Sequence, residues 1–471
     1  MDNLEQNIRQ LVGQVIKDMN LTPEPETNTE NIGAHSNLDS AVNAADIAFK
    51  EFTLVNLETR KDIIEEMRKI SLENRELLSK MAHEETGMGR WEDKIPKNLL
   101  AINKTPGVED IVPEAFSNDN GLTLVERAPY GVIGSISPST NPTATIISNA
   151  IGMVAAGNAV VFNTHPSAKK VSSFLIQLLN KAIVSKGGPK NLLTCVAEPT
   201  IESAKQLMSH KKIAILVVTG GPGVVKVAMN SGKKVIAAGP GNPPVVVDET
   251  ADIAKAGKDI VDGASFDNNV ICICEKEILV VESVADQLIK EMVKNRAYLL
   301  NKEQEKKITE LIIIEPGREG HEGLINKKYV GKNASLIAKD AGIDVPDNVR
   351  LLICDVDKDH PLVWTEQLMP VMPLVRVPNV DIAIDLAVAC EHGFRHTAIM
   401  HSLNIAKLSK MAKIMNCSIF IKNGPSYAGL GFGGAGFASF TIASPTGEGV
   451  TRARTFTRER RCTVVDYFRI I

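Results

Sequence analysis

Cys272 is the residue whose type and setting most directly suggest covalent chemistry. It lies between the polar string Phe266-Asp-Asn-Asn269 and an apolar segment. A thiolate in such a loop can attack an electrophilic carbon, but a free cysteine is also a common core residue, so both roles stay open. Cys274 lies two residues further on. No second cysteine pair follows and no histidine is near in sequence, so a zinc site is not predicted.

A glycine-rich string, Thr219-Gly-Gly-Pro-Gly223, follows an apolar run and opens a helical one. Glycines there let backbone amides approach a pyrophosphate at a helix N-terminus. The spacing differs from the usual dinucleotide fingerprint, and the lysine of a P-loop is missing. The string therefore predicts either a phosphate site or only a tight turn between a strand and a helix.

Two further polar features have open roles. Asn141, in Ser137-Pro-Ser-Thr-Asn-Pro142, stands between a predicted strand and a predicted helix. It can cap that helix or direct its side-chain NH₂ at a developing oxyanion. His392 and His396 are interpreted as polar residues of a helix-to-strand connection, because Gly393 and Phe394 lie between them.

The elements that must position these residues alternate regularly from residue 131 onward. Helical patterns precede them at about 38–52 and 57–86. We expect strands over 131–137, 158–162, 192–196 and 213–218, and helices over 143–156, 167–186, 200–210 and 223–231. This alternation predicts a parallel, doubly wound sheet. A second α/β run extends from 245 to about 421, with the boundary near 239–244.

The N-terminus and the bulk composition restrict the class of protein. Residues 4–19 form one amphipathic stripe, followed by a polar, proline-containing linker. A chain of 471 residues predicts two or three domains, and a net charge of −3 favours no nucleic-acid partner. No run is long enough to span a membrane, and no secretory signal is seen. Seven scattered cysteines do not resemble a disulfide framework, so a reducing cytosol is expected.

Seven strings in this chain, taken together, resemble the CoA-acylating aldehyde dehydrogenases of the propanediol- and ethanolamine-utilisation type, with clostridial butyraldehyde dehydrogenases as near relatives. In chain order they are Glu84-Glu-Thr-Gly-Met-Gly-Arg-Trp-Glu-Asp-Lys94, Asn118-Asp-Asn-Gly-Leu-Thr123, Ser137-Pro-Ser-Thr-Asn-Pro142, Thr219-Gly-Gly-Pro-Gly223, Ala238-Gly-Pro-Gly-Asn-Pro-Pro244, Phe266-Asp-Asn-Asn269 and Pro445-Thr-Gly-Glu-Gly-Val-Thr-Arg-Ala-Arg-Thr-Phe-Thr-Arg458.

The resemblance implies an α/β, aldehyde dehydrogenase-like fold. It comprises a Rossmann-type cofactor domain, an α/β catalytic domain and an oligomerisation arm. The corresponding boundaries are 1–19 for a candidate encapsulation helix, 20–34 for a linker, 35–240 for the nucleotide-binding domain, 241–424 for the catalytic thiol domain, and 425–471 for an active-site loop and oligomerisation tail.

The resemblance also implies roles for single residues. Cys272 would be the nucleophile, and Asn141 with the backbone N–H of Cys272 would bind the oxyanion. Glu366 would hold the nicotinamide ribose, since a carboxylate accepts from two vicinal hydroxyls. The cofactor-binding set is Thr140, Asn163, His165, Pro166, Thr219, Gly220, Gly221, Gly223, Gly239 and Glu366. The substrate-pocket set is Ile271, Phe437 and Ile442. No metal is expected.

Hydrolytic relatives carry a glutamate base in the segment that reads Ile236-Ala-Ala-Gly-Pro-Gly-Asn-Pro243 here. Its replacement by Ala237 implies transfer to CoA: a short-chain aldehyde, propanal foremost, gives acyl-CoA and NADH reversibly. NAD is expected, with NADP possible. The alternatives are a hydrolytic NAD(P)-dependent enzyme and a non-catalytic scaffold. Two departures from the family pattern are Cys274, where alanine is usual, and Ala435, where glutamate is frequent.

Partners follow from the two ends of the chain. Residues 1–19 resemble encapsulation peptides, which implies a shell or cargo partner and a location inside a bacterial microcompartment in the cytoplasm. The alternative is a helix that packs on its own subunit. The tail 451–465 mixes arginines with β-branched residues, as an exposed strand that pairs across subunits does, so a homo-oligomer is expected.

Overall fold

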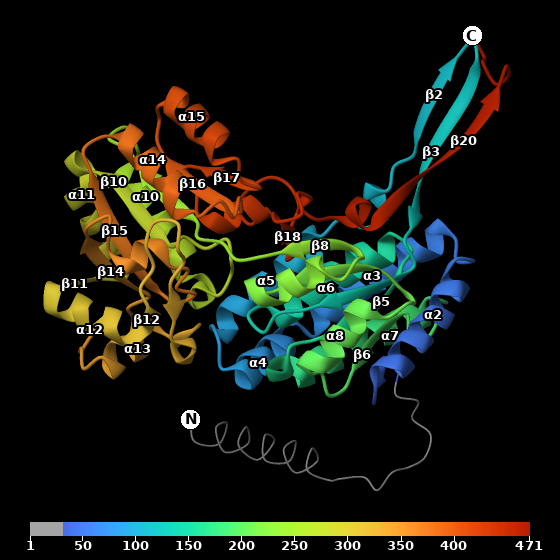
Figure 1. Cartoon of the computed structure of the whole chain (residues 1–471), viewed down its shortest axis with the longest axis horizontal. Coiled ribbons are helices and arrows are strands. Elements are labelled where there is room, and N and C mark those ends of the chain that lie inside the picture. The colour runs from blue at the N-terminus through green and yellow to red at the C-terminus, as the bar shows by residue number, and fades with distance from the viewer. Residues whose placement is uncertain (1–31) are drawn as a thin grey trace, which may run out of the picture. The chain divides into compact units, whose positions relative to one another are not determined.

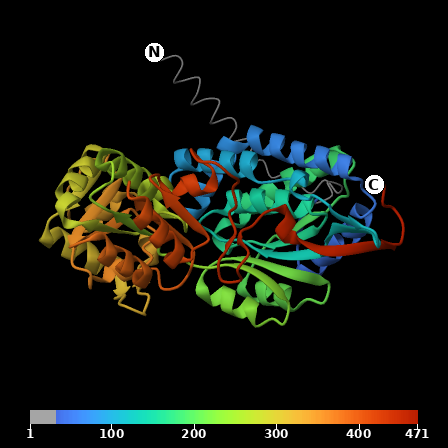
Figure 2. The ribbon, with the colours of Figure 1, turned by 90° about the horizontal axis from the view of Figure 1, so that it is seen from above.

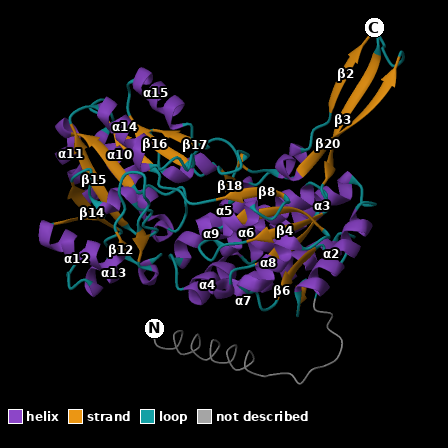
Figure 3. Ribbon diagram, in the orientation of Figure 1, coloured by secondary structure: helices purple, strands orange, loops and turns teal. Residues whose placement is uncertain are grey.

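The computed structural model describes residues 32–471 (Figure 1). The predicted helix over 1–19 and most of the predicted linker lie outside the described residues. Two parallel sheets and one antiparallel arm make up the described part (Figure 3). Within residues 32–471, no helix is long and apolar enough to cross a membrane.

The first sheet has six parallel strands in the order β1-β6-β5-β4-β7-β8. Their bounds are β1 Ala34–His35, β4 Val132–Ile136, β5 Ala159–Asn163, β6 Leu193–Val196, β7 Ile213–Thr219 and β8 Lys234–Ala238. The helices of this half are α2 Leu38–Phe52, α3 Leu57–Glu73, α4 Arg75–Thr86, α5 Trp91–Lys104, α6 Pro142–Ala155, α7 Lys169–Ser185, α8 Ile201–Ser209 and α9 Pro222–Met229. Its central strands are almost entirely buried, as expected when helices cover both faces.

The second sheet has seven parallel strands in the order β11-β14-β15-β10-β9-β16-β17. Their bounds are β9 Pro244–Val247, β10 Glu277–Val281, β11 Ala297–Leu300, β14 Leu351–Val356, β15 Val371–Val377, β16 Thr397–His401 and β17 Ile419–Lys422. Its helices are α10 Ile253–Ser265, α11 Glu282–Lys294, α12 Lys302–Ile312, α13 Ala334–Asp340, α14 Val380–Cys390 and α15 Ile405–Met415. Figure 2 shows this half beside the first sheet.

The arm is a three-stranded antiparallel sheet that projects away from the first sheet (Figure 1). Strands β2 (Glu114–Asn118) and β3 (Gly121–Pro129) form a hairpin, and β20 (Thr457–Val465) pairs with β3 along its whole length. The predicted tail strand thus exists, but within the chain it pairs with β3. Residues 114–129 belong structurally to this arm, although they fall inside the range predicted as the nucleotide-binding domain.

Short pairs complete the fold. The hairpin β12 (Ile313–Glu315) with β13 (Leu324–Ile325) follows α12, and β18 (Ile442–Ala443) pairs with β19 (Gly449–Val450). The second pair belongs to the tail that leads into the arm. It contacts the end of the first sheet, because Thr441 Oγ1 lies 2.8 Å from Thr219 Oγ1 at the end of β7.

Candidate active site

The carboxyl ends of β5, β4, β7 and β8 meet at one edge of the first sheet, because these strands are parallel neighbours. This edge brings together Asn163, the loop with Asn141, the glycine string and Gly239. Ligands of open α/β sheets bind at such carboxyl edges. The fold therefore gathers most of the predicted cofactor residues in one place.

The glycine string opens α9 and leaves room for a phosphate. A Cβ placed on Gly221 or Gly223 would meet no atom within 4 Å, whereas one on Gly220 would meet only a Val224 side chain. The start of α9 thus has open space beside it, as an anion site requires. Ser137 Oγ and Thr164 Oγ1, at the same edge, are buried without a partner in the described part of the chain. These features fit a dinucleotide.

Two of the predicted adenosine-side residues are engaged in local structure. Asn163 is buried, and its Oδ1 accepts a hydrogen bond of 2.6 Å from Ser203 Oγ in the first turn of α8. The His165 Nδ1 lies 2.7 Å from Ser167 Oγ and caps the short helix that begins at Pro166. Their contact with an adenosine stays a prediction.

Glu366 comes from the second half of the chain, between the short helix Pro361–Trp364 and β15. Its Oε1 accepts a weak hydrogen bond of 3.4 Å from the Gly241 N–H. Burial raises the pKa of this carboxyl to about 7, against the opposing charge of Lys276. A carboxyl with so little hydrogen bonding has free lone pairs, which suits the two hydroxyls of a ribose.

The loop before Cys272 has an unusual backbone. Asp267, Asn268 and Asn269 have φ of 48°, 53° and 66°, in the left-handed region that non-glycine residues enter at about 1–2 kcal/mol each. Side-chain contacts hold two of them there. Asn268 Nδ2 donates to Gly331 O at 2.9 Å, and Asn269 Nδ2 donates to Glu275 O at 2.9 Å. Because the surroundings fix each residue, the loop presents its cysteine in one geometry.

Exposure separates the two neighbouring thiols. Cys272 is partly accessible, whereas Cys274 is only 1% exposed and its Sγ faces Phe266 O at 3.9 Å. Burial, and next the negative charge of Glu366, raise the pKa of Cys272 to about 12, with Lys276 opposing them. The Cys272 thiol is therefore protonated at neutral pH before substrate arrives. Of the two cysteines, Cys272 is the one that a substrate can reach.

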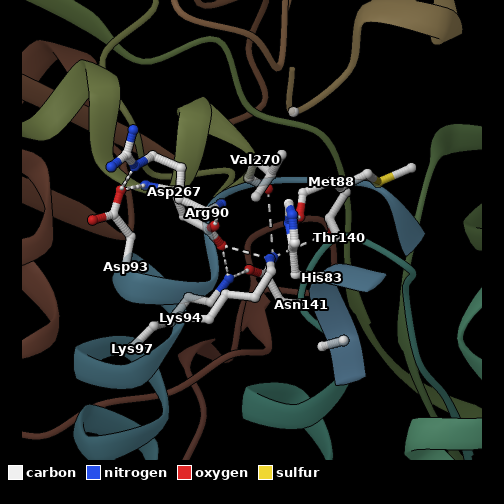
Figure 4. Close-up of polar contacts among 12 residues, drawn as sticks. His83, Met88, Arg90, Asp93, Lys94, Lys97, Thr140, Asn141, Asp267 and Val270 are labelled. Carbon is white, nitrogen blue, oxygen red and sulfur yellow. Dashed lines mark hydrogen bonds and ion pairs between the residues drawn. The ribbon is translucent and has the colours of Figure 1, made fainter. Parts of the chain in front are cut away.

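Asn141 faces the nucleophile loop and does not cap its helix. It precedes α6, but its side chain makes no capping hydrogen bond to that helix. Its Nδ2 instead lies 3.5 Å from Val270 O, two residues before Cys272, and its Oδ1 accepts from Lys97 Nζ at 2.8 Å (Figure 4). The amide N–H groups thus point to the segment that carries the thiol, where an oxyanion would form.

No motif in the sequence indicated that Gly241 and His396 lie against each other. A Cβ on Gly241 would lie 2.9 Å from His396 Cγ and 3.0 Å from Cys272 O, so Gly241 fits between them. His396 is fully buried, and its Nε2 has no hydrogen-bond partner within residues 32–471. Burial and Lys276 lower the pKa of His396 to about 4, so the imidazole is neutral. His396 directly precedes β16, in the predicted helix-to-strand connection, and it packs against Gly241.

Comparison with known proteins places this arrangement in a family. The aldehyde dehydrogenase family model matches residues 20–448. An acetylating acetaldehyde dehydrogenase of Bilophila wadsworthia is 50% identical, with 100% of both chains covered. The chain belongs to the aldehyde dehydrogenase family, in its CoA-acylating branch. The fold class predicted from the sequence is thereby confirmed.

Solved structures of this branch superpose closely. One is the Rhodopseudomonas palustris propionaldehyde dehydrogenase with bound CoA and an acylated cysteine: TM-score 0.89, 48% identity, 92% of this chain and 98% of that chain covered. Another is a propionaldehyde dehydrogenase from the fucose-utilisation microcompartment of Clostridium phytofermentans: TM-score 0.90, 48% identity, 93% and 100% covered.

The position where a hydrolytic aldehyde dehydrogenase has its base holds no carboxylate. Ala237 is fully buried in β8, and its N–H donates to Thr446 Oγ1 at 3.0 Å. Gly239 fits against Pro445, whose Cγ would lie 3.1 Å from an added Cβ. The tail therefore closes over this end of the first sheet.

The predicted pocket residues of this aldehyde dehydrogenase lie in two settings. Ile271 and Ile442 are buried in one apolar cluster with the nucleophile loop packed against it. Phe437 is partly exposed under the Arg452 guanidinium, 5.4 Å from its ring centre. Their role as the wall of a substrate pocket stays a prediction.

Proposed function

We propose that this chain oxidises a short-chain aldehyde with NAD and transfers the acyl group from Cys272 to CoA, reversibly. The observation that carries this proposal is the pairing of an accessible thiol and a facing Asn141 amide with an alanine, Ala237, where a hydrolytic base would stand. NADP is the alternative nucleotide, and propanal is the proposed aldehyde.

The mechanism begins at Cys272. Its sulfur forms a bond to the aldehyde carbon as the thiol proton leaves, and the carbonyl oxygen becomes an anion within reach of Asn141 Nδ2 and the Cys272 N–H. A bound nicotinamide would supply the hydride acceptor, and loss of the hydride from the substrate carbon would leave Cys272 carrying a thioester. The thiol of CoA then attacks that thioester and releases Cys272. The imidazole of His396 is the proton acceptor that we propose for these steps, because its Nε2 has no partner within residues 32–471 and its ring packs against Gly241, beside the Cys272 backbone.

The same residues explain why CoA rather than water receives the acyl group. Hydrolysis at neutral pH gains roughly 10²–10⁴-fold from a positioned general base, and Ala237 cannot supply one. A thiol needs less help, because sulfur is intrinsically nucleophilic and a small fraction is already thiolate. The thioester on Cys272 should therefore persist until CoA binds and attacks it.

Without CoA, we expect a burst of about one NADH per active site from propanal and NAD, followed by very slow turnover. Adding CoA should restore sustained turnover, because it removes the acyl group. Stopped-flow absorbance of NADH with quantified acyl products measures both phases. Rapid steady-state acid formation without CoA would establish the hydrolytic alternative, and no NADH under either condition would establish the scaffold alternative.

We propose that the chain forms a homo-oligomer through the arm. The outer strands β2 and β20 leave unpaired backbone edges, and Phe116 and Val465 are exposed on them. Exposed strand edges pair with another chain. Light scattering at micromolar concentration should show at least a dimer, and deletion of 457–471, which removes β20, should lower the mass. Deletion of 467–471 alone keeps β20 and serves as the control. A monomeric full chain would contradict the proposal.

We also propose that residues 1–19 direct the enzyme to a microcompartment shell or cargo protein in the cytoplasm. The support is their amphipathic stripe, which is followed by a proline-containing linker. Deleting 1–19 should leave the specific activity nearly unchanged but remove co-localisation with shells. Loss of activity or aggregation of the deletion variant would instead assign the helix to the subunit's own fold.

A further inference from the structure

A buried group of charged residues connects α5 to the nucleophile loop (Figure 4). Lys97, on α5, is 2% exposed and Asp267, on the loop, is fully buried, and their side chains form an ion pair. Lys94 Nζ binds the same carboxylate at 3.0 Å, and the Arg90 N–H donates to it at 2.7 Å. Buried ammonium groups are rare, and burying two of them beside one carboxylate costs solvation energy. A functional role would explain why this group of charges is buried.

Lys97 differs from Lys94 in having a second contact. Its Nζ donates to Asn141 Oδ1 at 2.8 Å. An asparagine amide can sit in two orientations that differ only by exchange of O and N, but an ammonium has donors and no acceptor. The hydrogen bond from Lys97 therefore forms only when the Asn141 amide is oriented with its Oδ1 toward the ammonium group. That orientation turns both Nδ2 protons away from α5, to Val270 O and to Thr140 Oγ1 at 3.2 Å.

The positive charge of Lys97 also favours binding of an oxyanion by the Asn141 amide. A cation at the oxygen end of an amide draws electron density from the nitrogen, so the N–H groups become stronger donors. The 3.5 Å contact of Nδ2 with Val270 O is long, which leaves this donor free for a better acceptor. The oxygen of a substrate bound to Cys272 becomes such an acceptor as negative charge forms on it.

We propose that Lys97, anchored by Asp267, is the positioning residue that fixes the Asn141 amide with its N–H groups toward the oxyanion at Cys272. The proposal rests on the acyl-transfer function proposed above. Because Asp267 precedes Cys272 by five residues, one carboxylate sets the position of both the nucleophile loop and the oxyanion donor. Lys97 itself touches neither substrate nor cofactor and acts through Asn141.

The test is a double-mutant cycle on the burst of NADH formation from propanal with saturating NAD and no CoA. Asn141→Ala should slow the burst by about 10²–10³-fold. Lys97→Met should slow it by about 10- to 100-fold, since part of the same stabilisation is lost. In the Asn141→Ala background, Lys97→Met should have almost no further effect, because the group through which it acts is gone. Equal effects in both backgrounds, or a wild-type burst rate in Lys97→Met, would overturn the proposal.

Lys94→Met is the matched control. It removes an ammonium from the same carboxylate, but within residues 32–471 Lys94 makes no hydrogen bond to Asn141, so this variant should slow the burst far less than Lys97→Met. Lys97→Arg, which keeps a charged donor, should recover part of the rate. Thermal unfolding and NADH binding by fluorescence show whether each variant is folded. If Lys97→Met does not fold, Lys97→Gln replaces it in the double-mutant cycle, and the same burst rates support or overturn the proposal. A failed proposed function would be recognised separately, because the wild-type chain itself would then show no burst.

Discussion

Cys272→Ala is expected to abolish aldehyde oxidation and acyl-CoA reduction alike, by about 10⁴-fold or more. Both directions pass through an acyl group bound to sulfur, and Cys272 is the partly exposed cysteine of the nucleophile loop. Binding of NADH should change little, because Cys272 is not one of the residues predicted to hold the nucleotide. Stopped-flow assays of both directions and NADH fluorescence measure these quantities.

Cys274→Ala is the matched control for this experiment. Cys274 is buried, whereas Cys272 is partly exposed, so a substrate cannot reach the Cys274 thiol. The resemblance described above leads us to expect alanine at this position. We expect near-normal turnover and a loss of about 1 kcal/mol in unfolding free energy for the lost contacts. Substantial turnover in Cys272→Ala that disappears on adding Cys274→Ala would move the nucleophile to Cys274.

The sheets of this enzyme could be predicted from sequence because their strands are buried on both faces. Such strands are continuous apolar runs that contrast with the amphipathic helices between them. The strand predicted over 131–137 is Val132–Ile136, and the helix predicted over 223–231 is Pro222–Met229. The predicted and observed bounds differ by one or two residues, because capping residues and turns determine where a helix or strand ends.

The arm could not be predicted in the same way. All five residues of β2 are exposed, so no apolar pattern marks them as a strand. Strand β3 pairs with β20, more than three hundred positions along the chain, where Gly121 faces Val465. A pattern of neighbouring residues does not indicate which distant strand a segment pairs with. The sequence therefore indicated an exposed tail strand but not its partner within the chain.

The positioning groups of the site were missed for a related reason. Lys97 lies on a helix with a lysine-rich sequence, where charged residues normally face solvent. Its burial depends on Asp267, 170 residues away. His396 likewise packs against Gly241, beside the Cys272 loop, although it is more than one hundred residues further along the chain. Resemblance identified the residues expected to touch ligands, whereas only the folded chain shows which residues hold them.

Gly241→Ala is expected to lower kcat by about 10²-fold with little change in NADH affinity. The backbone of Gly241 is not in the left-handed region, so the effect is steric. Its new Cβ would lie 2.9 Å from His396 Cγ and 3.0 Å from Cys272 O. His396 is held by Glu391 and Thr397, at 2.8 Å each. The nucleophile loop must therefore shift to relieve the contact with Cys272 O, and misplacement of a reacting atom is costly, about 10²-fold for 1 Å.

Gly221→Ala distinguishes this effect from a general sensitivity of the glycines. A Cβ at Gly221 meets no protein atom within 4 Å, but it fills space that we assign to a phosphate. We expect this variant to raise the KM for NAD while the burst rate at saturating NAD stays near that of the unmodified enzyme. Gly241→Ala should do the reverse. Steady-state kinetics over a range of NAD concentrations, with thermal unfolding as a check on folding, separates the two. A normal kcat in Gly241→Ala would show that the contact between Gly241, His396 and Cys272 does not set the position of the thiol during catalysis.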